Sequence, residues 1–266
     1  MVETSALNGE KIKKYLSEGK RFDGRKTDEF REISIETGVS KNAEGSARVK
    51  IGKTDVMVGI KMDAAAPYPD SMDKGNLMVN AELLPLSSSK FESGPPKFPS
   101  IELARIIDRG IRESKFIQLE KLCIKEGEKV WTVMIDIYSL NDDGNLLDAA
   151  GIAAIAALKT AKIPKYDAEK EKVLFGELSD KNIPLTKEIP VSLTVHKIGD
   201  GFLVDPTAEE EAISGARLTV ASSNGIIFSM QKGDLAELSI EEFNEALDLV
   251  EKTEKEIFKK LEKHLK

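Results

Sequence analysis

Cysteine and histidine are almost absent from this chain of 266 residues. The one cysteine, Cys123, excludes an intrachain disulfide and leaves almost nothing for a cysteine-based metal site. It stands between Leu122 and Ile124, so we expect it to be buried as a small apolar residue. The two histidines, His196 in a strand-like run and His264 near the end, are too few for a zinc site or a histidine-based triad. We therefore expect no metal and no cofactor.

An excess of positive charge and a long apolar run are also missing. Lys and Arg number 39 against 46 Asp and Glu, so contact with nucleic acid must come from a local patch. No stretch is typical of a signal peptide or a membrane span, and we expect a cytoplasmic protein without membrane contact. With 41% hydrophobic and 32% charged residues, the chain can bury a core and hold two subdomains or one large α/β unit.

A strand, a turn and a helix follow one another in the middle of the chain. Residues 130–140 alternate as a strand, and the small residues of 145–161 predict a helix. A glycine turn that opens a helix directs backbone N–H groups and the positive end of the helix dipole at one point, as in a phosphate site. Here Asp142, Asp143 and Asp148 crowd that point, and no lysine or arginine lies near it. The alternative interpretation is an ordinary turn with a capped helix.

The remaining segments predict a mixture of strands and helices. Expected strands are 31–37, 45–51, 55–62 and 77–84, then 189–196, 201–204, 216–221 and 225–230 as an antiparallel meander. Expected helices are 8–19 (Ile12, Tyr15 and Leu16 on one side), 100–116, and one from Ser239 with a Ser239/Glu242 capping box. Residues 52–54 predict a tight hairpin, and the charged segment 165–182 has no regular pattern.

Three arginines on the helix 100–116 form the best candidate binding site. Arg105, Arg109 and Arg112 have i, i+4, i+7 spacing and project within one narrow arc. Guanidinium groups at that spacing can hold successive phosphates of an extended strand. The alternative is a self-paired surface, because three acids lie three or four residues away: Glu102, Asp108 and Glu113.

Three consecutive glutamates at 209–211 follow a strand and form a second candidate. Such a group can bind a divalent cation, although a solvated turn is the more usual explanation. Arg217 stands six residues beyond Glu211, where a paired-acid site would need a second carboxylate.

Five short segments then point to a family: RFDGR at 21–25, GSA at 45–47 with GKT at 52–54, NAELLPL at 80–86, ELAR at 102–105 and residues 142–150. Each is weak by itself, but their order and spacing over nearly the whole chain resemble the RNase PH family. The ELLPL and LLDAA segments favour, within that family, the non-catalytic ring subunits of the archaeal exosome.

The resemblance implies a chemistry that this chain has lost. Active members degrade RNA from its 3′ end by phosphorolysis and hold phosphate with a Gly-Ser/Thr-Arg turn at a helix start. The matching positions here are Gly144, Asn145 and Leu146, without the arginine. Active members also carry two aspartates six residues apart, and the matching positions here are Glu211 and Arg217. The resemblance therefore implies a subunit with no catalytic residue of its own.

The same resemblance implies a fold and partners. The fold is α/β (α+β), with helices packed on mixed sheets in two β-α subdomains: an N-terminal helix and arm (1–30), subdomain 1 (31–164), a linker region (165–189) and subdomain 2 (190–266). Each copy pairs with a catalytic RNase PH-like subunit, three pairs close a hexameric ring, and RNA-binding cap subunits join it. Arg105 and Arg109, with Arg112 less firmly placed, resemble residues that touch the backbone of single-stranded RNA near the active site.

Two other interpretations stay open at this point. The chain can be an active phosphate-dependent 3′-5′ exoribonuclease in which Glu211 and other acids serve catalysis, or a homo-oligomer without any RNA role.

Overall fold

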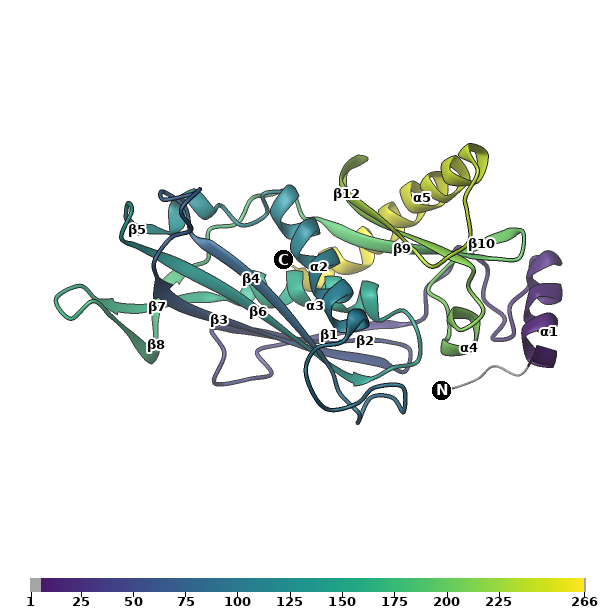
Figure 1. Ribbon diagram of the computed structural model, residues 1–266, viewed down its shortest axis with the longest axis horizontal. Helices are drawn as coiled ribbons and strands as arrows, with labels where there is room; N and C mark the ends of the chain where they lie inside the picture. Colours follow the sequence, from purple (N-terminus) through teal and green to yellow (C-terminus); the bar gives the residue numbers. More distant parts are fainter. Residues whose placement is uncertain (1–5, 266) are drawn as a thin grey trace.

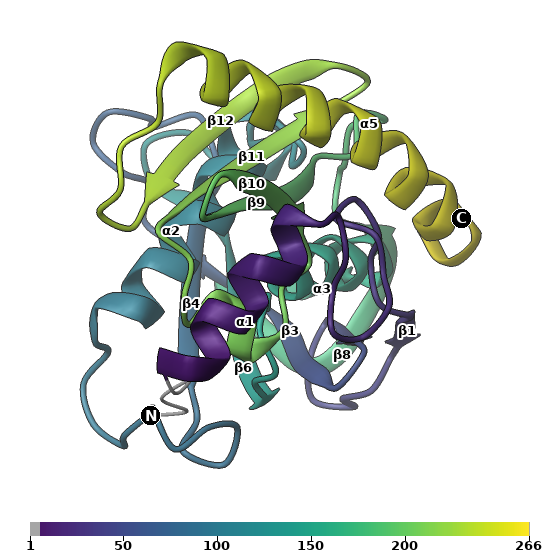
Figure 2. The same cartoon turned by 90° about the vertical axis from the view of Figure 1, so that its right-hand side faces the viewer.

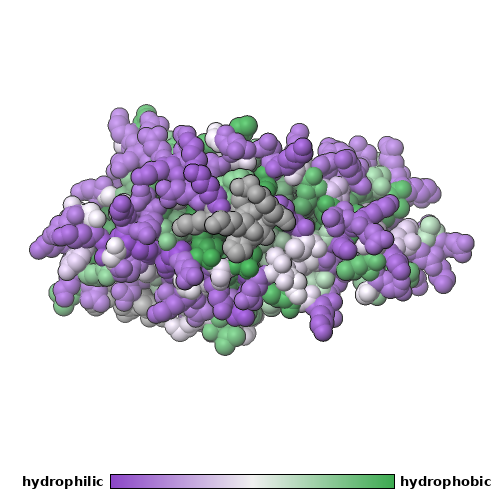
Figure 3. Space-filling view, turned by 180° about the vertical axis from the view of Figure 1, so that it is seen from behind, coloured by the Kyte–Doolittle hydropathy of each residue, from purple (hydrophilic) through white to green (hydrophobic). Residues whose placement is uncertain are grey.

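The computed structural model describes residues 6–265, apart from the side chains at positions 6, 260 and 262–265. The side chain of His264 therefore lies outside the described residues. A long sheet crosses the left and centre of Figure 1, and a smaller sheet lies at the upper right, with α2 and α3 between them. A separate two-stranded hairpin forms the left end, and α1 forms the right end. Figure 3 shows hydrophilic side chains over most of the opposite face, with hydrophobic ones in small groups.

The long sheet has the order β1-β2-β3-β6-β4, and β5 pairs with β6 beside β4. Its strands are β1 (Ile33–Thr37), β2 (Gly45–Ile51), β3 (Thr54–Ala65), β4 (Asn76–Leu83), β5 (Cys123–Lys125) and β6 (Lys129–Asn141). Only β4 and β6 run parallel. The predicted hairpin between β2 and β3 is confirmed: Ile51 pairs with Thr54, and Gly52 takes a φ of 58° that favours glycine.

The smaller sheet has the order β10-β9-β11-β12 and is antiparallel throughout. Its strands are β9 (Val191–Ile198), β10 (Gly201–Val204), β11 (Ala216–Ser223) and β12 (Ile226–Gly233). The four strands were predicted correctly, but the simple meander was wrong. Strands β10 and β11 both flank β9, because the chain leaves the sheet after β10 and returns on the other side.

Helix α3 (Leu146–Thr160) lies between the two sheets, against β2 and β3 on one side and β9 on the other. Its alanines are buried all round, which explains why it shows small residues and no polar face. The packing is close: a Cβ added at Gly45 in β2 would lie 2.5 Å from the carbonyl oxygen of Ala157. Both sheets therefore fix the position at which α3 begins.

Helix α2 (Phe98–Glu113) packs between β4 and β12 and carries the arginines. The helix predicted at 100–116 is confirmed, and five residues at helical spacing form its buried apolar stripe: Leu103, Ile106, Ile107, Gly110 and Ile111. With that stripe facing inward, Arg105 and Arg109 are left on the exposed side of the helix.

The other helices are α1 (Ala6–Ser17), the 3-10 helix η1 (Leu119–Leu122), α4 (Ala208–Glu211) and α5 (Ile240–Leu265). Helix α5 covers the outer side of the smaller sheet (Figure 2). Its predicted capping box is confirmed: Ser239 N–H donates to Glu242 Oε2 at 2.9 Å, and Glu242 N–H donates to Ser239 Oγ at 3.2 Å. No helix in the described part of the chain is long and apolar enough to span a membrane.

The segment 165–182 is regular, contrary to the prediction. It forms most of the hairpin of β7 (Lys162–Asp167) and β8 (Lys172–Asn182), which stands apart from both sheets. Most of β8 is exposed on both faces. A strand of this kind has no buried side, so its sequence does not alternate between apolar and polar residues. The strand therefore cannot be predicted from such alternation.

Cys123 is more exposed than predicted, and the apolar side of α1 is only partly covered. Cys123 is only partly buried at the start of β5. Tyr15 is 43% exposed and packs its ring against Phe22, with the ring centroids 4.8 Å apart. Of the three residues predicted on one side of α1, Ile12 alone is fully buried.

Candidate RNA-binding groove and closed anion cradle

A groove of about 470 Å³ lies between α2 and the strands β11 and β12. Arg105 and Arg109 line it from the helix, and Thr219, Ser229 and Gln231 line it from the strands. Its polar lining and two guanidinium groups suit a charged, extended ligand.

The two arginines of this groove are available to a ligand. Arg105 is exposed, and its guanidinium forms no hydrogen bond or ion pair with any described residue. Arg109 pairs with Glu113 at 2.9 Å, and the two side chains are 51% and 39% exposed. An exposed pair of this kind contributes about 0–1 kcal/mol, so a phosphate can displace the glutamate.

Arg112 has a different set of contacts from its two neighbours. It donates to both carboxylate oxygens of Asp108, at 3.1 and 2.7 Å, and to the carbonyl oxygen of Leu77 in β4, at 3.1 Å. The hydrogen bonds with Asp108 raise the pKa of Arg112 above its ordinary value. Arg112 thus ties α2 to β4, and the predicted row divides into two exposed arginines and one structural one.

The acids beside the row explain this division. Glu102 does not neutralise Arg105, because its carboxylate accepts from Arg217 Nη2 at 2.5 Å and from Gln231 Nε2 at 2.9 Å. Asp108 and Glu113 do neutralise their arginines. The self-paired alternative therefore holds for Arg112, in part for Arg109, and not for Arg105.

The turn that opens α3, residues 142–145, has the backbone arrangement of an anion site, and we call it the anion cradle. Its N–H groups already bond to oxygen atoms of the chain. Asp143 N–H donates to Thr54 Oγ1 at 3.2 Å, and Gly144 N–H donates to Asp142 Oδ1 at 3.1 Å. Asn145 N–H donates to Glu211 Oε2 at 3.2 Å. Three successive donors that would face a phosphate thus face a hydroxyl and two carboxylates.

The backbone closes the cradle from a second side. Gly144 has a φ of +86°, and a Cβ there would lie 2.5 Å from the carbonyl oxygen of Pro206. Arg31 donates to the carbonyl oxygens of Asp143 at 2.9 Å and Gly144 at 3.1 Å. The segment before α4 therefore lies directly on the turn, and glycine is required for this approach.

The pocket beside the cradle, about 370 Å³, is lined by titratable side chains that include His196, Glu211 and Arg217. Burial, and next the charge of Asp142, raise the pKa of Glu211. Burial, and next the charge of Arg217, lower the pKa of His196 to about 3, so this imidazole is neutral at pH 7. Arg217 itself is held by Glu102 and lies 3.7 Å from Asp234. The described residues contain no group of three or more His, Cys, Asp or Glu side chains that could hold a metal ion.

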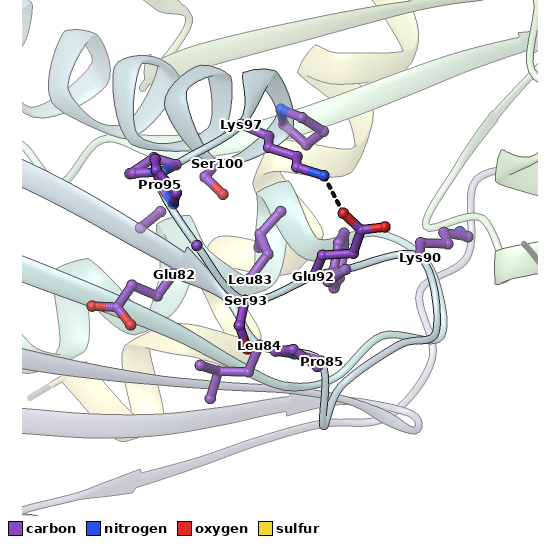
Figure 4. Close-up of a pocket in the computed structure, with 15 residues that line it drawn as sticks. Glu82, Leu83, Leu84, Pro85, Lys90, Glu92, Ser93, Pro95, Lys97 and Ser100 are labelled. Carbon is purple, nitrogen blue, oxygen red and sulfur yellow. Dashed lines mark hydrogen bonds and ion pairs between the residues drawn. The ribbon is translucent and has the colours of Figure 1, made fainter.

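A third pocket, about 350 Å³, lies under the loop between β4 and α2. Leu83 and Pro85 line it on one side and Pro95 on the other, and Lys97 pairs with Glu92 across the loop (Figure 4). Lys90, which also lines it, lies 3.8 Å from Asp142. Its cations are thus already paired, unlike Arg105.

Sequence reasoning missed the buried carboxylate of Asp205. Arg31 donates to its two oxygens at 2.9 and 2.7 Å, Arg25 Nη1 donates at 2.7 Å, and Asn145 Nδ2 donates at 2.9 Å. Burial by itself would raise the pKa of Asp205, but the hydrogen bonds and charge of Arg31 outweigh it and lower that pKa. Nothing in the local sequence of Asp205 distinguishes it from an ordinary turn residue.

A second buried pair joins the arm to the same region. Arg21 Nε and Nη2 donate to Glu210 at 2.9 and 2.6 Å, and both side chains are almost fully buried. The RFDGR segment at 21–25 therefore stabilises the contact between the arm and α4.

Comparison with known proteins gives one consistent result. Sequence models of the 3′ exoribonuclease family match as domain 1 over residues 29–164 and as domain 2 over residues 188–252. The chain is 47% identical over 247 residues to the protein named exosome complex component Rrp42 of Methanocella arvoryzae, covering 92% of both chains. It is 48% identical over 235 residues to the protein of that name from Archaeoglobus fulgidus, covering 88% of both.

Two solved structures are similar over the same length. A chain of the Archaeoglobus fulgidus exosome with RNA bound to the active site matches with a TM-score of 0.84 and 46% identity, over 91% of this chain and 93% of that one. A chain of an archaeal exosome core matches with a TM-score of 0.85 and 41% identity, over 98% and 100%.

Proposed function

Because the chain belongs to the 3′ exoribonuclease (RNase PH) family and has its fold, we propose that it is a non-catalytic ring subunit of an archaeal exosome. It pairs with a catalytic RNase PH-like subunit in phosphorolytic 3′-to-5′ degradation of RNA. It shapes the active site at the interface and contacts the RNA backbone. The proposed location is the cytoplasm.

The observation that carries the non-catalytic role is the contact between Glu211 and the Asn145 N–H group, 3.2 Å long. That N–H group belongs to the turn to which the resemblance assigns the phosphate, and Leu146 stands there in place of the anchoring arginine. Arg217, where the resemblance expects a second acid, is held by Glu102. The active-exoribonuclease alternative needs both positions for chemistry, so these contacts favour the non-catalytic proposal.

The groove beside α2 supports the RNA contact. Arg105 and Arg109 are one helical turn apart, about 6 Å, which is close to the phosphate spacing of an extended strand. Each charge-assisted bond to phosphate contributes about 1.5–3 kcal/mol. We assign the contact to these two arginines, while Arg112 keeps the helix on β4.

The proposed partners follow from the relatives. Relatives of nearly the same length are named exosome components, and the matched chains come from exosome assemblies, one of them with RNA. In this proposal the catalytic partner supplies the phosphate turn and the acids, three pairs close a hexameric ring, and RNA-binding cap subunits join it.

The test is reconstitution from purified subunits. This chain alone is expected to release no nucleoside diphosphate from RNA and phosphate, whereas the mixture forms an alternating hexamer by native mass spectrometry and is active. A ring with Glu211→Gln, which keeps an oxygen for Asn145 N–H, should keep at least about half of the activity. Phosphate-dependent turnover by this chain alone, lost with Glu211→Gln, would establish the active-exoribonuclease alternative instead.

A further inference from the structure

The end of the molecule formed by α1 and the turn after it carries a second groove. Figure 2 shows α1 as the outermost layer of that end, and Figure 1 places it away from α2. The groove measures about 590 Å³, and its lining includes Lys11, Lys14, Tyr15, Lys20 and Phe22. Nothing in the proposed function uses these residues.

The groove is basic in an acidic protein. Three lysines line it against one glutamate, Glu18, while the whole chain has a net charge of −7. Lys11 and Lys14 are exposed, three residues apart on one side of α1, and neither forms an ion pair with a described residue. Lys20 lies 3.5 Å from Glu18. The local field therefore attracts an anion.

Two aromatic rings lie among these lysines. Phe22 is 52% exposed and Tyr15 is 43% exposed, and the two rings meet at an angle of 55°. The backbone beside Phe22 is anchored, because the side chain of its neighbour Arg21 is buried and bonded to Glu210 through two atoms. Burial of Arg21 thus holds an exposed aromatic ring beside unpaired cations.

We propose that this groove is a second binding site for single-stranded RNA. A base stacks on the rings of Phe22 and Tyr15, and the flanking phosphates bind Lys11 and Lys14. An acidic protein segment would pair with the lysines but leave the two rings exposed to water. A nucleotide can pair its phosphates with the lysines and stack its base on the rings. Stacking on the rings and ion pairs with phosphates involve no hydrogen bond to the edge of a base. We therefore expect binding with little sequence preference.

The experiment places a reporter in the groove. Phe22→Trp adds a fluorophore to a chain whose only other tryptophan, Trp131, is 8% exposed. The variant is made in the Arg105→Glu/Arg109→Glu background, which removes the proposed α2 contact, and is titrated with a short oligoadenylate as full chain and as assembled ring. We expect saturable quenching that weakens with salt and is absent without Phe22→Trp.

A second pair of variants tests the lysines. Lys11→Glu/Lys14→Glu should weaken binding at least about tenfold and flatten its salt dependence, and Lys11→Gln/Lys14→Gln should do so less, with α-helical circular dichroism unchanged in both. Absence of quenching, its loss on ring assembly, or unchanged affinity in both lysine variants would overturn the proposal. Equal quenching by a glutamate-rich peptide of the same charge would identify a protein-docking site instead.

Discussion

Arg31 and Asp205 are 174 residues apart in the chain, yet the guanidinium of Arg31 donates to both oxygens of the Asp205 carboxylate, at 2.9 and 2.7 Å. The same guanidinium holds the carbonyl oxygens of the 143–144 turn, and Asn145 reaches the same carboxylate. One ion pair thus joins the residue Arg31 shortly before β1, the start of α3 and the residue that follows β10. It keeps the anion cradle closed.

Asp205→Asn should lower the free energy of unfolding by up to about 3–5 kcal/mol, because it removes the buried carboxylate that Arg25 and Arg31 share and leaves them only the more exposed Asp23 and Asp143. Urea unfolding at pH 7 measures the change. The exposed Asp200→Asn, in the turn before β10, is the matched control and should change stability by less than about 0.5 kcal/mol. Since the pKa of Asp205 is lowered in the native state, its contribution is complete above about pH 4 and is lost as pH falls further, through the native-state pKa, so the two proteins should converge toward low pH.

Asp148 should affect the pH dependence of stability in the direction opposite to Asp205, and Asp148→Asn tests this. Burial raises the pKa of Asp148 to about 8; Thr194 donates to one of its oxygens, and the other has no partner among the described residues. The native state therefore keeps a proton that the unfolded chain loses, and stability falls as pH rises from about 4 to about 8.

The slope expected from this one group is about 1.4 kcal/mol per pH unit. The asparagine side chain of the variant cannot ionise, so the variant should gain stability over the wild type toward pH 8 and have no advantage at pH 4. Thermal unfolding from pH 4 to pH 9 tests this. Parallel profiles for the two proteins would mean that Asp148 ionises normally in the fold.

Arg105→Glu/Arg109→Glu in the reconstituted ring should weaken binding of single-stranded RNA by at least about tenfold and flatten its salt dependence. The ring should stay intact, because the apolar side of α2 is untouched. Filter binding across a salt series, beside a sizing run, makes the measurement. The control, Lys172→Glu/Lys181→Glu, makes the same charge change on exposed positions of β8. An equal loss in both variants would indicate a general field effect and no contact at α2.

Arg112→Gln should separate the structural arginine from the other two. We expect a loss of about 0.5–1 kcal/mol in the free energy of unfolding, because its pair with Asp108 is partly exposed and one carbonyl bond to β4 is lost. RNA affinity and its salt slope should stay within about twofold of the wild type. A flattened salt slope with unchanged stability would instead return Arg112 to the RNA-contact row.

Side-chain periodicity predicted the elements that have one buried face. The helix α2, the hairpin at Gly52 and the capping box at Ser239 were all predicted correctly, because each depends on residues a few positions apart. The hairpin of β7 and β8 was missed, since strands exposed on both faces impose no alternation. The division into subdomains at residues 31–164 and 190–266 stays a prediction.

The candidate site was predictable in its residues and not in its contacts. Spacing placed three arginines in one arc of α2. Which of them contacts β4 depends on how the helix packs against that strand, and this packing brings Arg112 to the carbonyl oxygen of Leu77. The position of Glu102 beside Arg105 suggested neutralisation, yet Arg217 and Gln231 on β11 and β12 take its carboxylate. Their sequence separations, 115 and 129 residues, exceed the reach of any local pattern.

The sequence by itself determined the family, the main helices and most of the strands, and the presence of Leu146 and Arg217 at the two positions where the resemblance expects an arginine and an acid. These features depend on residue identity and short-range order. Only the tertiary structure decided which groups contact the turn at the start of α3. Packing of α4 on the 142–145 turn brings Glu211 to the Asn145 N–H group, and burial of Arg21 holds Phe22 exposed beside the lysines of α1. Such contacts arise from two sheets closing on α3, and their geometry is a property of the whole fold.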